Sequence, residues 1–424
     1  MSPHDRLWNK DFFLLWQGQF VSQLGTQAFT IAMMYWLMRA TGSATLMGTT
    51  MMASMLPAVL LGPVGGAVAD RFSRRAIIIA CDVVSGVGVL SLAGLMFLAP
   101  ERTGLIAAWL VCISVGGGVV RAFFAPAITA AVPSIVPEAR VAAANAVNEG
   151  STHISTIVGQ GLGGILFRVL GAPLLLLFDG LTYLFSAVSE CFIDIPQALP
   201  ERARGWRQTL SASLADLREG IAHVRARRGL MHLMVAAAAI NFFGVPFMVL
   251  LPFYVEEGLA KGPEWFGFLL AASGAGSLLG YSVAGSVRLG RRARTAAMLA
   301  CLFGVALSLG LLGVIVRPFA ALGLIAAAGA TSGFFNIHTI TLLQTTTPEA
   351  MRGRVFGVLH TLVMGLTPVS LALTGVVADL AHHDAPLLLT ACGAVLVVVT
   401  AAASLDGTLR GFLGGEAEPG SACL

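Results

Sequence analysis

Charged residues are scarce in this chain of 424 residues: only 11% are Asp, Glu, Lys or Arg, whereas 56% are hydrophobic. A soluble globular protein carries about 25% charged residues. This shortage argues against a water-soluble fold and predicts that lipid surrounds most of the chain. The apolar runs are continuous and on the order of 20 residues long. Membrane β-barrels show short alternating segments instead, so we expect transmembrane helices.

Other residues and motifs are missing as well. Lysine occurs only at Lys10 and Lys261, and the net charge of +4 comes from arginines dispersed among the connectors, which does not indicate a nucleic-acid surface. The six cysteines show no CxxC spacing, and we expect reduced thiols and no metal site. The sequence contains no P-loop, HExxH or GxSxG motif, so we expect no enzymatic activity and no cofactor. The polar stretch from Ser2 to Asp11 does not fit a cleavable signal peptide.

Apolar runs of sufficient length predict an all-α polytopic membrane protein with twelve transmembrane helices. The longest connector, residues 194–229, separates an N-terminal six-helix half (1–193) from a C-terminal half (230–405), and a tail (406–424) follows. The predicted spans are 12–38, 46–69, 76–98, 104–126, 142–167, 173–193, 230–255, 265–287, 293–316, 319–343, 354–380 and 386–405.

The distribution of positive charge predicts the orientation of these helices. The connectors on the side of both termini carry twenty lysines and arginines, and those on the opposite side carry five. The positive-inside rule therefore predicts cytoplasmic termini and a cytoplasmic middle connector. In that connector Leu210, Leu214, Leu217, Ile221 and Val224 recur at steps of four and three, which predicts an amphipathic helix on the membrane surface. A tether between the halves is its simplest role, and a regulatory or partner-binding role is the alternative.

The two halves of the sequence resemble each other. Arg74-Arg75 opens the third span and Arg291-Arg292 opens the ninth, while Pro-Glu-Ala precedes both the fifth and the eleventh. Matching connectors at matching places predict an internal duplication of six helices. Repeats of this kind are typical of secondary transporters, which bind substrate near mid-membrane between the halves.

The connector between the second and third spans is the most distinctive motif. It runs from Gly66 to Arg75 and contains Asp70, Arg71, Arg74 and Arg75. This pattern resembles the motif of the major facilitator superfamily at the same connector, with Ser73 where glycine is usual. The resemblance covers the whole chain and implies the two-half transporter fold of that superfamily.

Several finer motifs resemble one branch of the superfamily, the exporters of the macrolide-efflux and enterobactin-exporter type. They are Pro137-Glu138, Ala144-Asn145-Ala146, Asp216-Leu217-Arg218-Glu219-Gly220 and Asp179 in the sixth span. The resemblance also implies that Gly66, Asp70, Arg71, Arg74 and Arg75 form a conformational latch. A carboxylate beside guanidinium groups can form charge-assisted bonds that break in another conformation. The alternative for the arginines is simple anchoring at the cytoplasmic surface.

Ionisable residues inside spans are costly and are therefore candidates for proton coupling. Glu149 and Arg121 lie at similar depth in consecutive spans, where an ion pair released by protonation of Glu149 is one hypothesis. Snorkelling of Arg121 to the interface is the other. Asp82 is expected near Asp70 in a structural role. For Asp179, structural and coupling roles remain open, and Glu190 is expected at the membrane interface.

A polar stripe on the first span offers candidates for the substrate cavity. Gln19, Gln23 and Gln27 recur at steps of four and so share one face of the helix. They either line the cavity or form hydrogen bonds between helices. The resemblance places the first, fourth, seventh and tenth helices at the cavity, which adds Asn241, Asn336, His338 and Gln344. A lone histidine such as His338 is more often a packing residue.

A glycine motif in the fifth span, made of Gly159, Gly161, Gly163 and Gly164, formally fits GxGxxG. No strand precedes it, so it does not indicate a dinucleotide fold. It resembles the antiporter motif of the superfamily, although Gln160 replaces the usual proline. Close helix packing through small residues is the simpler interpretation.

Together these features predict a monomeric transporter of the bacterial inner membrane. We expect it to export a bulky amphipathic or apolar small molecule, such as a drug, a macrolide, a siderophore or another metabolite. The absence of a P-loop favours proton antiport as the energy source. The alternatives are a flippase for lysophospholipids or other lipids, and a solute importer of the same fold.

Overall fold

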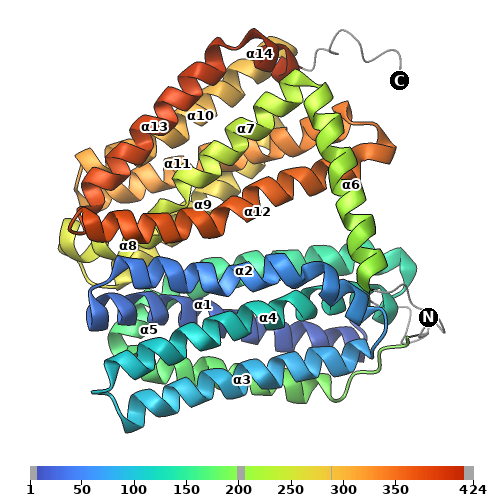
Figure 1. Cartoon of the computed structure of the whole chain (residues 1–424), viewed down its shortest axis with the longest axis vertical. Helices are drawn as coiled ribbons and strands as arrows, with labels where there is room; N and C mark the ends of the chain where they lie inside the picture. The colour runs from blue at the N-terminus through green and yellow to red at the C-terminus, as the bar shows by residue number, and fades with distance from the viewer. Residues whose placement is uncertain (1–6, 198–205, 288, 415–424) are drawn as a thin grey trace. The chain divides into compact units, whose positions relative to one another are not determined.

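The computed structural model describes residues 7–197, 206–287 and 289–414 (Figure 1). Its described backbone is mostly helical and contains no strand. The chain divides into two compact units: unit 1 is Met1–Ala212 with Gly262–Gly267, and unit 2 is Ser213–Lys261 with Phe268–Leu424.

The described part of unit 1 contains five long helices, three of which are capped by the side chain of the preceding residue: Asn9 caps α1, Ser43 caps α2 and Ser73 caps α3. A short 3-10 turn precedes the last of the five helices. The helices are α1 (Lys10–Thr41), α2 (Ala44–Ala69), α3 (Arg74–Leu98), α4 (Thr103–Ile135) and α5 (Val141–Glu190). Inside α5, Gly171 has a φ of 72° and Pro173 follows it. Glycine adopts this conformation without steric cost, so the kink separates the fifth and sixth predicted spans.

Unit 2 contains most of α6 (Trp206–Ala226) and the helices that follow it. The seventh predicted span is broken into α7 (Arg228–Gly244), α8 (Pro246–Phe253) and a π-turn, Tyr254–Gly258, with Pro246 at the first break. The remaining helices are α9 (Glu264–Ser286), α10 (Arg291–Val314), α11 (Pro318–Thr346), α12 (Glu349–Leu380), α13 (Ala385–Leu405) and α14 (Gly407–Gly414).

Ten of the described helical stretches are long and apolar enough to cross a membrane. One of them, Glu138–Glu190, contains two of the predicted spans, because the kink at Gly171 divides it. Helix α1 is not among the ten, and its glutamines make it more polar than the others. With α1 added and the kinked helix divided, the twelve predicted crossings are accounted for, and the predicted all-α membrane fold is confirmed.

Two elements, the helix of the middle connector and the start of the tail, differ from the sequence prediction. The apolar face of α6, with Leu217, Ile221 and Val224, packs into the core of unit 2, where Val355 and Val358 of α12 lie. This helix is therefore covered by protein along that face instead of by lipid alone. The side chains of Leu210 and Leu214 lie outside the described part of the chain.

The predicted tail also begins with a short helix. Helix α14 buries its apolar residues Leu409, Phe412 and Leu413 in the same core cluster, and Asp406 accepts hydrogen bonds from the amides of Thr408 and Leu409 at its start. Apolar residues at steps of three and one, after an Asp cap, are sufficient for such a helical turn. Residues 415–424 of the predicted tail lie outside the described residues.

Candidate functional site

The arginines of the α2–α3 connector are bound within unit 1. Arg74 Nη1 donates hydrogen bonds to the Ala130 carbonyl at 2.9 Å and to Ser134 Oγ at 3.1 Å, both near the end of α4. Arg75 donates to the carbonyl of Cys191, just after α5. These contacts tie the connector to the ends of two neighbouring helices, as expected of an anchor.

Asp70 behaves differently from these arginines. Its side chain is exposed, and its backbone N–H donates to the Gly66 carbonyl at 3.1 Å. No ion pair of the Asp70 carboxylate occurs within the described ranges. The carboxylate is therefore accessible to a partner, and the latch role of Gly66, Asp70, Arg71, Arg74 and Arg75 stays a prediction.

Three acidic side chains of unit 1 are almost fully buried. Asp82 of α3 is 2% exposed, and Asp179 and Glu190 of α5 are each 1% exposed. The sequence analysis expected Asp82 to lie near Asp70. Instead, Asp82 lies against Glu190. Glu190 is the last residue of α5 and is covered by α1, and its place at the membrane interface stays a prediction.

A hydrogen-bonded group, which we call the carboxyl cluster, consists of Gln19, Asp82, Ser186 and Glu190. Gln19 Nε2 donates to Glu190 Oε1 at 2.8 Å and to Ser186 Oγ at 3.3 Å. Ser186 Oγ donates to Glu190 Oε1 at 3.3 Å. The Asp82 carboxyl is close enough to interact with both Ser186 and Glu190, where α3 packs against α5. The cluster therefore joins α1, α3 and the last turns of α5.

The carboxyl cluster contains no positive charge. In the described part of unit 1, no ion pair includes Asp82 or Glu190, and Asp82 Oδ2 and Glu190 Oε2 are buried without a hydrogen-bond partner. Ionised carboxyl groups can only accept hydrogen bonds. A hydrogen bond between the two groups thus requires a proton on one of them.

Asp179 is a second buried acid, about three turns earlier in α5. A β-carbon added to Gly25 of α1 would lie 2.6 Å from Asp179 Oδ1 and 3.1 Å from its Cα. Asp179 Oδ1 has no hydrogen-bond partner in the structure. Beside it, the Tyr183 and Thr26 hydroxyls lie 2.9 Å apart. Gly25 thus lets α1 close over an acid that no cation neutralises.

The predicted ion pair between Arg121 and Glu149 is not formed. Both side chains are exposed, and no salt bridge joins them among the residues that the structure describes. The two residues lie at similar depth along α4 and α5, but similar depth does not place them on facing sides of their helices. They stay candidates for coupling without the contact that the sequence suggested.

The polar stripe of α1 forms hydrogen bonds between helices. Gln27 Oε1 accepts from Gln160 Nε2 at 2.9 Å, and Gln27 Nε2 donates to Thr156 Oγ1 at 3.3 Å. Gln19 belongs to the carboxyl cluster, while Gln23 Oε1 is buried without a partner. These contacts favour the interhelical interpretation for Gln19 and Gln27, and Gln160 uses the position of the usual proline to bind α1.

The glycine motif of α5 lies at close helix contacts. A β-carbon on Gly159 would lie 2.7 Å from Gln27 Cβ, and one on Gly163 would lie 2.6 Å from Ile31 Cδ1. Gly164 faces the Pro263 carbonyl, and the Gly161 carbonyl lies beside Gly267, both in the short segment that belongs to unit 1. Larger side chains would push these segments apart.

The cavity candidates of unit 2 have varied surroundings. Asn241 Oδ1 accepts a hydrogen bond from Thr367 Oγ1 at 2.9 Å. His338 stacks on Phe334 with ring centroids 4.2 Å apart, and its Nδ1 lies 3.1 Å from the Phe334 carbonyl. Asn336 and Gln344 are exposed. The last two are open to a ligand, whereas Asn241 and His338 have internal partners.

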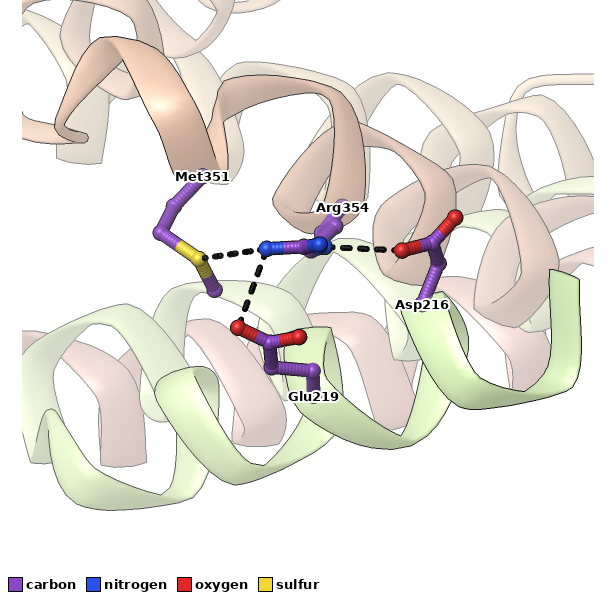
Figure 2. A network of polar contacts seen from close by, with 4 residues as sticks. All are labelled: Asp216, Glu219, Met351 and Arg354. Atoms are coloured by element: carbon purple, nitrogen blue, oxygen red, sulfur yellow. Dashed lines mark hydrogen bonds and ion pairs between the residues drawn. The ribbon is translucent and has the colours of Figure 1, made fainter. Parts of the chain in front are cut away.

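A polar network joins α6 to the start of α12 within unit 2. Figure 2 shows Arg354 between two acids of α6: its Nε lies 2.9 Å from Asp216 Oδ1, and its Nη1 lies 2.9 Å from Glu219 Oε1. Met351 Sδ contacts the same guanidinium at 3.5 Å. Asp216 and Glu219 belong to the motif that indicated the exporter branch, but the sequence did not reveal their partner.

Sequence reasoning missed Glu190 as a site residue. The missed pattern was the polar face of the sixth span, where Asp179, Tyr183, Ser186 and Glu190 recur at steps of four, three and four. Such spacing places polar groups along one side of a helix. In lipid that side must face protein, so the pattern indicates a buried polar contact with another helix.

Comparison with known proteins identifies related sequences. A family model described as Major Facilitator Superfamily matches residues 15–371. Macrolide efflux protein A of Streptococcus pyogenes is 24% identical over 376 residues, which cover 88% of this chain and 90% of that protein. Multidrug efflux pump Tap of Mycolicibacterium fortuitum is 28% identical over 386 residues, with the same coverage of 88% and 90%. The predicted resemblance to drug-efflux members of this superfamily is thereby confirmed.

Solved structures share the fold. The nucleoside transporter NupG superposes with a TM-score of 0.72 at 12% identity and covers 92% of this chain and 99% of its own. An inward-facing bacterial homologue of the iron transporter ferroportin has a TM-score of 0.70 at 15% identity, with coverage of 93% and 98%. These likenesses concern the fold alone.

Proposed function

Since the chain belongs to the Major Facilitator Superfamily, we propose that it exports a bulky amphipathic or apolar small molecule across a bacterial inner membrane in exchange for protons. The cargo class is a drug, a macrolide, a siderophore or another metabolite. Support comes from relatives named as efflux pumps, which match about nine-tenths of the chain. We also propose a monomer with both termini in the cytoplasm.

The observation that carries proton coupling is the set of buried acids in unit 1. Asp82, Asp179 and Glu190 lie inside a membrane-spanning unit and have no basic partner among the described side chains. A low-dielectric surrounding disfavours a carboxylate, so such an acid binds a proton while it is buried. It releases the proton when a conformational change admits water. Buried acids of this kind are characteristic of proton relays in transporters.

Alternating access supplies that conformational change. In this proposal the two halves rock about a central substrate site. Asp70, which is exposed and unpaired in the described structure, acts as the acid of the latch at the α2–α3 connector. Asn336 and Gln344, the exposed polar residues of α11, contact the cargo.

A drug-accumulation experiment tests the proposal. The chain is expressed in bacterial cells that lack their major efflux pumps, and the accumulation of a macrolide and of a lipophilic cationic dye is followed with and without an uncoupler. We expect less accumulation on expression, and full accumulation once the proton gradient has collapsed. Cells that carry the empty vector are the control.

Three outcomes contradict the proposal. Unchanged accumulation of all probes argues against a drug exporter, and efflux that survives the uncoupler argues against proton coupling. Faster inward movement of a labelled lysophospholipid would favour the flippase alternative instead.

A further inference from the structure

The carboxyl cluster combines three features that a purely structural contact would not need. Its two acids are at most 2% exposed, they are close enough to interact with each other, and each has one buried oxygen without a partner. Isolated polar atoms in such surroundings cost free energy, and a pair of carboxylates costs more. A structural role would be filled at lower cost by an amide pair or by apolar side chains.

The charged and titratable groups around the cluster leave it without a counterion. From α3 the Cys81 thiol lies close to both acids, and from α5 Tyr183 and Asp179 lie further along the same face. Arg121 of α4 is near enough to influence Tyr183, and Arg75 is bound to the Cys191 carbonyl. Helix α1 contributes only the neutral amide of Gln19.

We propose that Asp82 and Glu190 share a single proton, which makes this pair the proton-binding site of the exporter, with Gln19 as its positioning residue. The inference rests on the proposed proton-driven export and names the groups that carry the proton.

The proton balance of the step is simple. In the closed cluster one carboxyl is an acid whose O–H bond points at the carboxylate of the other. When water enters, that O–H bond breaks, the proton leaves on a water molecule, and two carboxylates remain. They repel each other at short range, so α3 and the end of α5 separate until a proton returns. No electron is transferred, and one proton is moved per cycle.

Gln19 connects this event to α1. Its amide donates to both Glu190 and Ser186. A movement of the Glu190 carboxyl therefore changes a direct contact of α1. Two turns further along the same face, Gln27 binds Gln160 of α5. Helix α1 therefore contacts α5 through polar bonds at both places, and a shift at the carboxyl cluster changes how these helices fit together.

The first experiment detects the shared proton directly. The purified full chain in lipid nanodiscs is titrated with base while the carbonyl stretch of protonated carboxylic acids is recorded by infrared difference spectroscopy. The variants are Glu190→Gln and Asp82→Asn. In each, the new amide N–H takes the place of the acid O–H, so the remaining acid stays ionised. Asp194→Asn, which changes an exposed acid just after α5, is the matched control.

We expect one component of the wild-type band to be missing in both cluster variants and present in the control. Gel filtration and circular dichroism verify that each variant is folded, and a variant that fails is replaced by the other member of the pair. Persistence of every component in a folded cluster variant would overturn the shared proton.

The second experiment separates this inference from the proposed function. Proteoliposomes are loaded with the macrolide or dye, and two rates are measured: transport driven by a pH gradient, and exchange of labelled for unlabelled cargo without a gradient. We expect both cluster variants to retain exchange while their gradient-driven transport falls to that of protein-free vesicles. Gln19→Leu should slow both rates.

The outcomes are distinguishable. If the wild-type protein moves no probe, the proposed export fails, and the infrared band still decides whether the pair shares a proton. If a pH gradient drives transport by the wild type and drives it equally fast in the Glu190→Gln and Asp82→Asn variants, the proposed export stands. The assignment of the proton-binding site is then wrong.

Discussion

The two units differ in their buried acidic side chains. Unit 1 buries three acids, Asp82, Asp179 and Glu190, without a cation beside them. In unit 2, four partly exposed acids near the ends of helices have basic partners, as Glu264 of unit 1 has in Arg168. The pairs of unit 2 are Asp216 and Glu219 with Arg354, Asp379 with His383, and Asp406 with His232.

This difference distinguishes acids with a proposed chemical role from acids with a structural role. Exposed ion pairs contribute about 0–1 kcal/mol each and can be replaced with little effect, so we expect the pairs of unit 2 to have a minor structural role. An unpaired buried acid lowers stability and persists only where a function requires it. The comparison therefore supports our proposal that the proton chemistry belongs to unit 1, and it can be tested by variants that change burial, neutrality or pairing.

The largest expected effect comes from breaking the burial of Asp179. In Gly25→Val the new β-carbon would lie 2.5 Å from Thr182 Oγ1 and 3.1 Å from the Asp179 Cα, so α1 must move away from α5. Overpacking of this kind costs typically 1–3 kcal/mol. We expect a clear fall in the thermal unfolding midpoint of the detergent-solubilised protein.

The matched control for this variant is Gly94→Val in α3, where an added β-carbon meets nothing within 4 Å. Both substitutions change helix propensity equally, so the difference between them reports packing. Equal midpoints for the two variants would mean that α1 does not close tightly over Asp179.

A smaller effect on the unfolding midpoint, which should differ between the two units, is expected when acids are made neutral. Asp179→Asn removes a carboxyl that has no partner at Oδ1, and its amide has the same shape, so the unfolding midpoint should not fall. Asp379→Asn removes the negative charge 2.9 Å from His383 Nε2, and its midpoint should fall slightly. A lower midpoint for Asp179→Asn than for Asp379→Asn would reverse the comparison.

Much of the fold could be predicted from sequence because its causes are local. Apolar runs and polar connectors locate the helices, and even the break at Gly171 falls between two predicted spans. The packing of α6 was harder to anticipate, because an amphipathic face fits a membrane surface or a protein core equally well. Only the position of Val355 and Val358 decides between them.

The carboxyl cluster was beyond sequence reasoning for a geometric reason. Position along a span gives the depth of a residue, but the side of the helix that meets a neighbour depends on how helices rotate and pair. Asp82 and Glu190 are far apart in the chain and meet only because α3 and α5 pack together. The same limitation explains why Arg121 and Glu149, at similar depth, do not meet.

The smallest expected effect concerns Asp406, an acid of unit 2 outside the membrane spans. Burial alone would raise the pKa of its carboxyl, but the amides of Thr408 and Leu409 and the neighbouring His232 lower it below the ordinary 3.8. Stability from this group is therefore present above pH 3.8 and is lost as the pH falls through the lower pKa of the folded state. Asp406→Asn should cost less than about 1 kcal/mol near neutral pH. In thermal melts of variant and wild type, this difference should disappear in strong acid, because a protonated Asp406 is as neutral as asparagine; a difference that grows on acidification would show that the pair with His232 is not what Asp406 contributes.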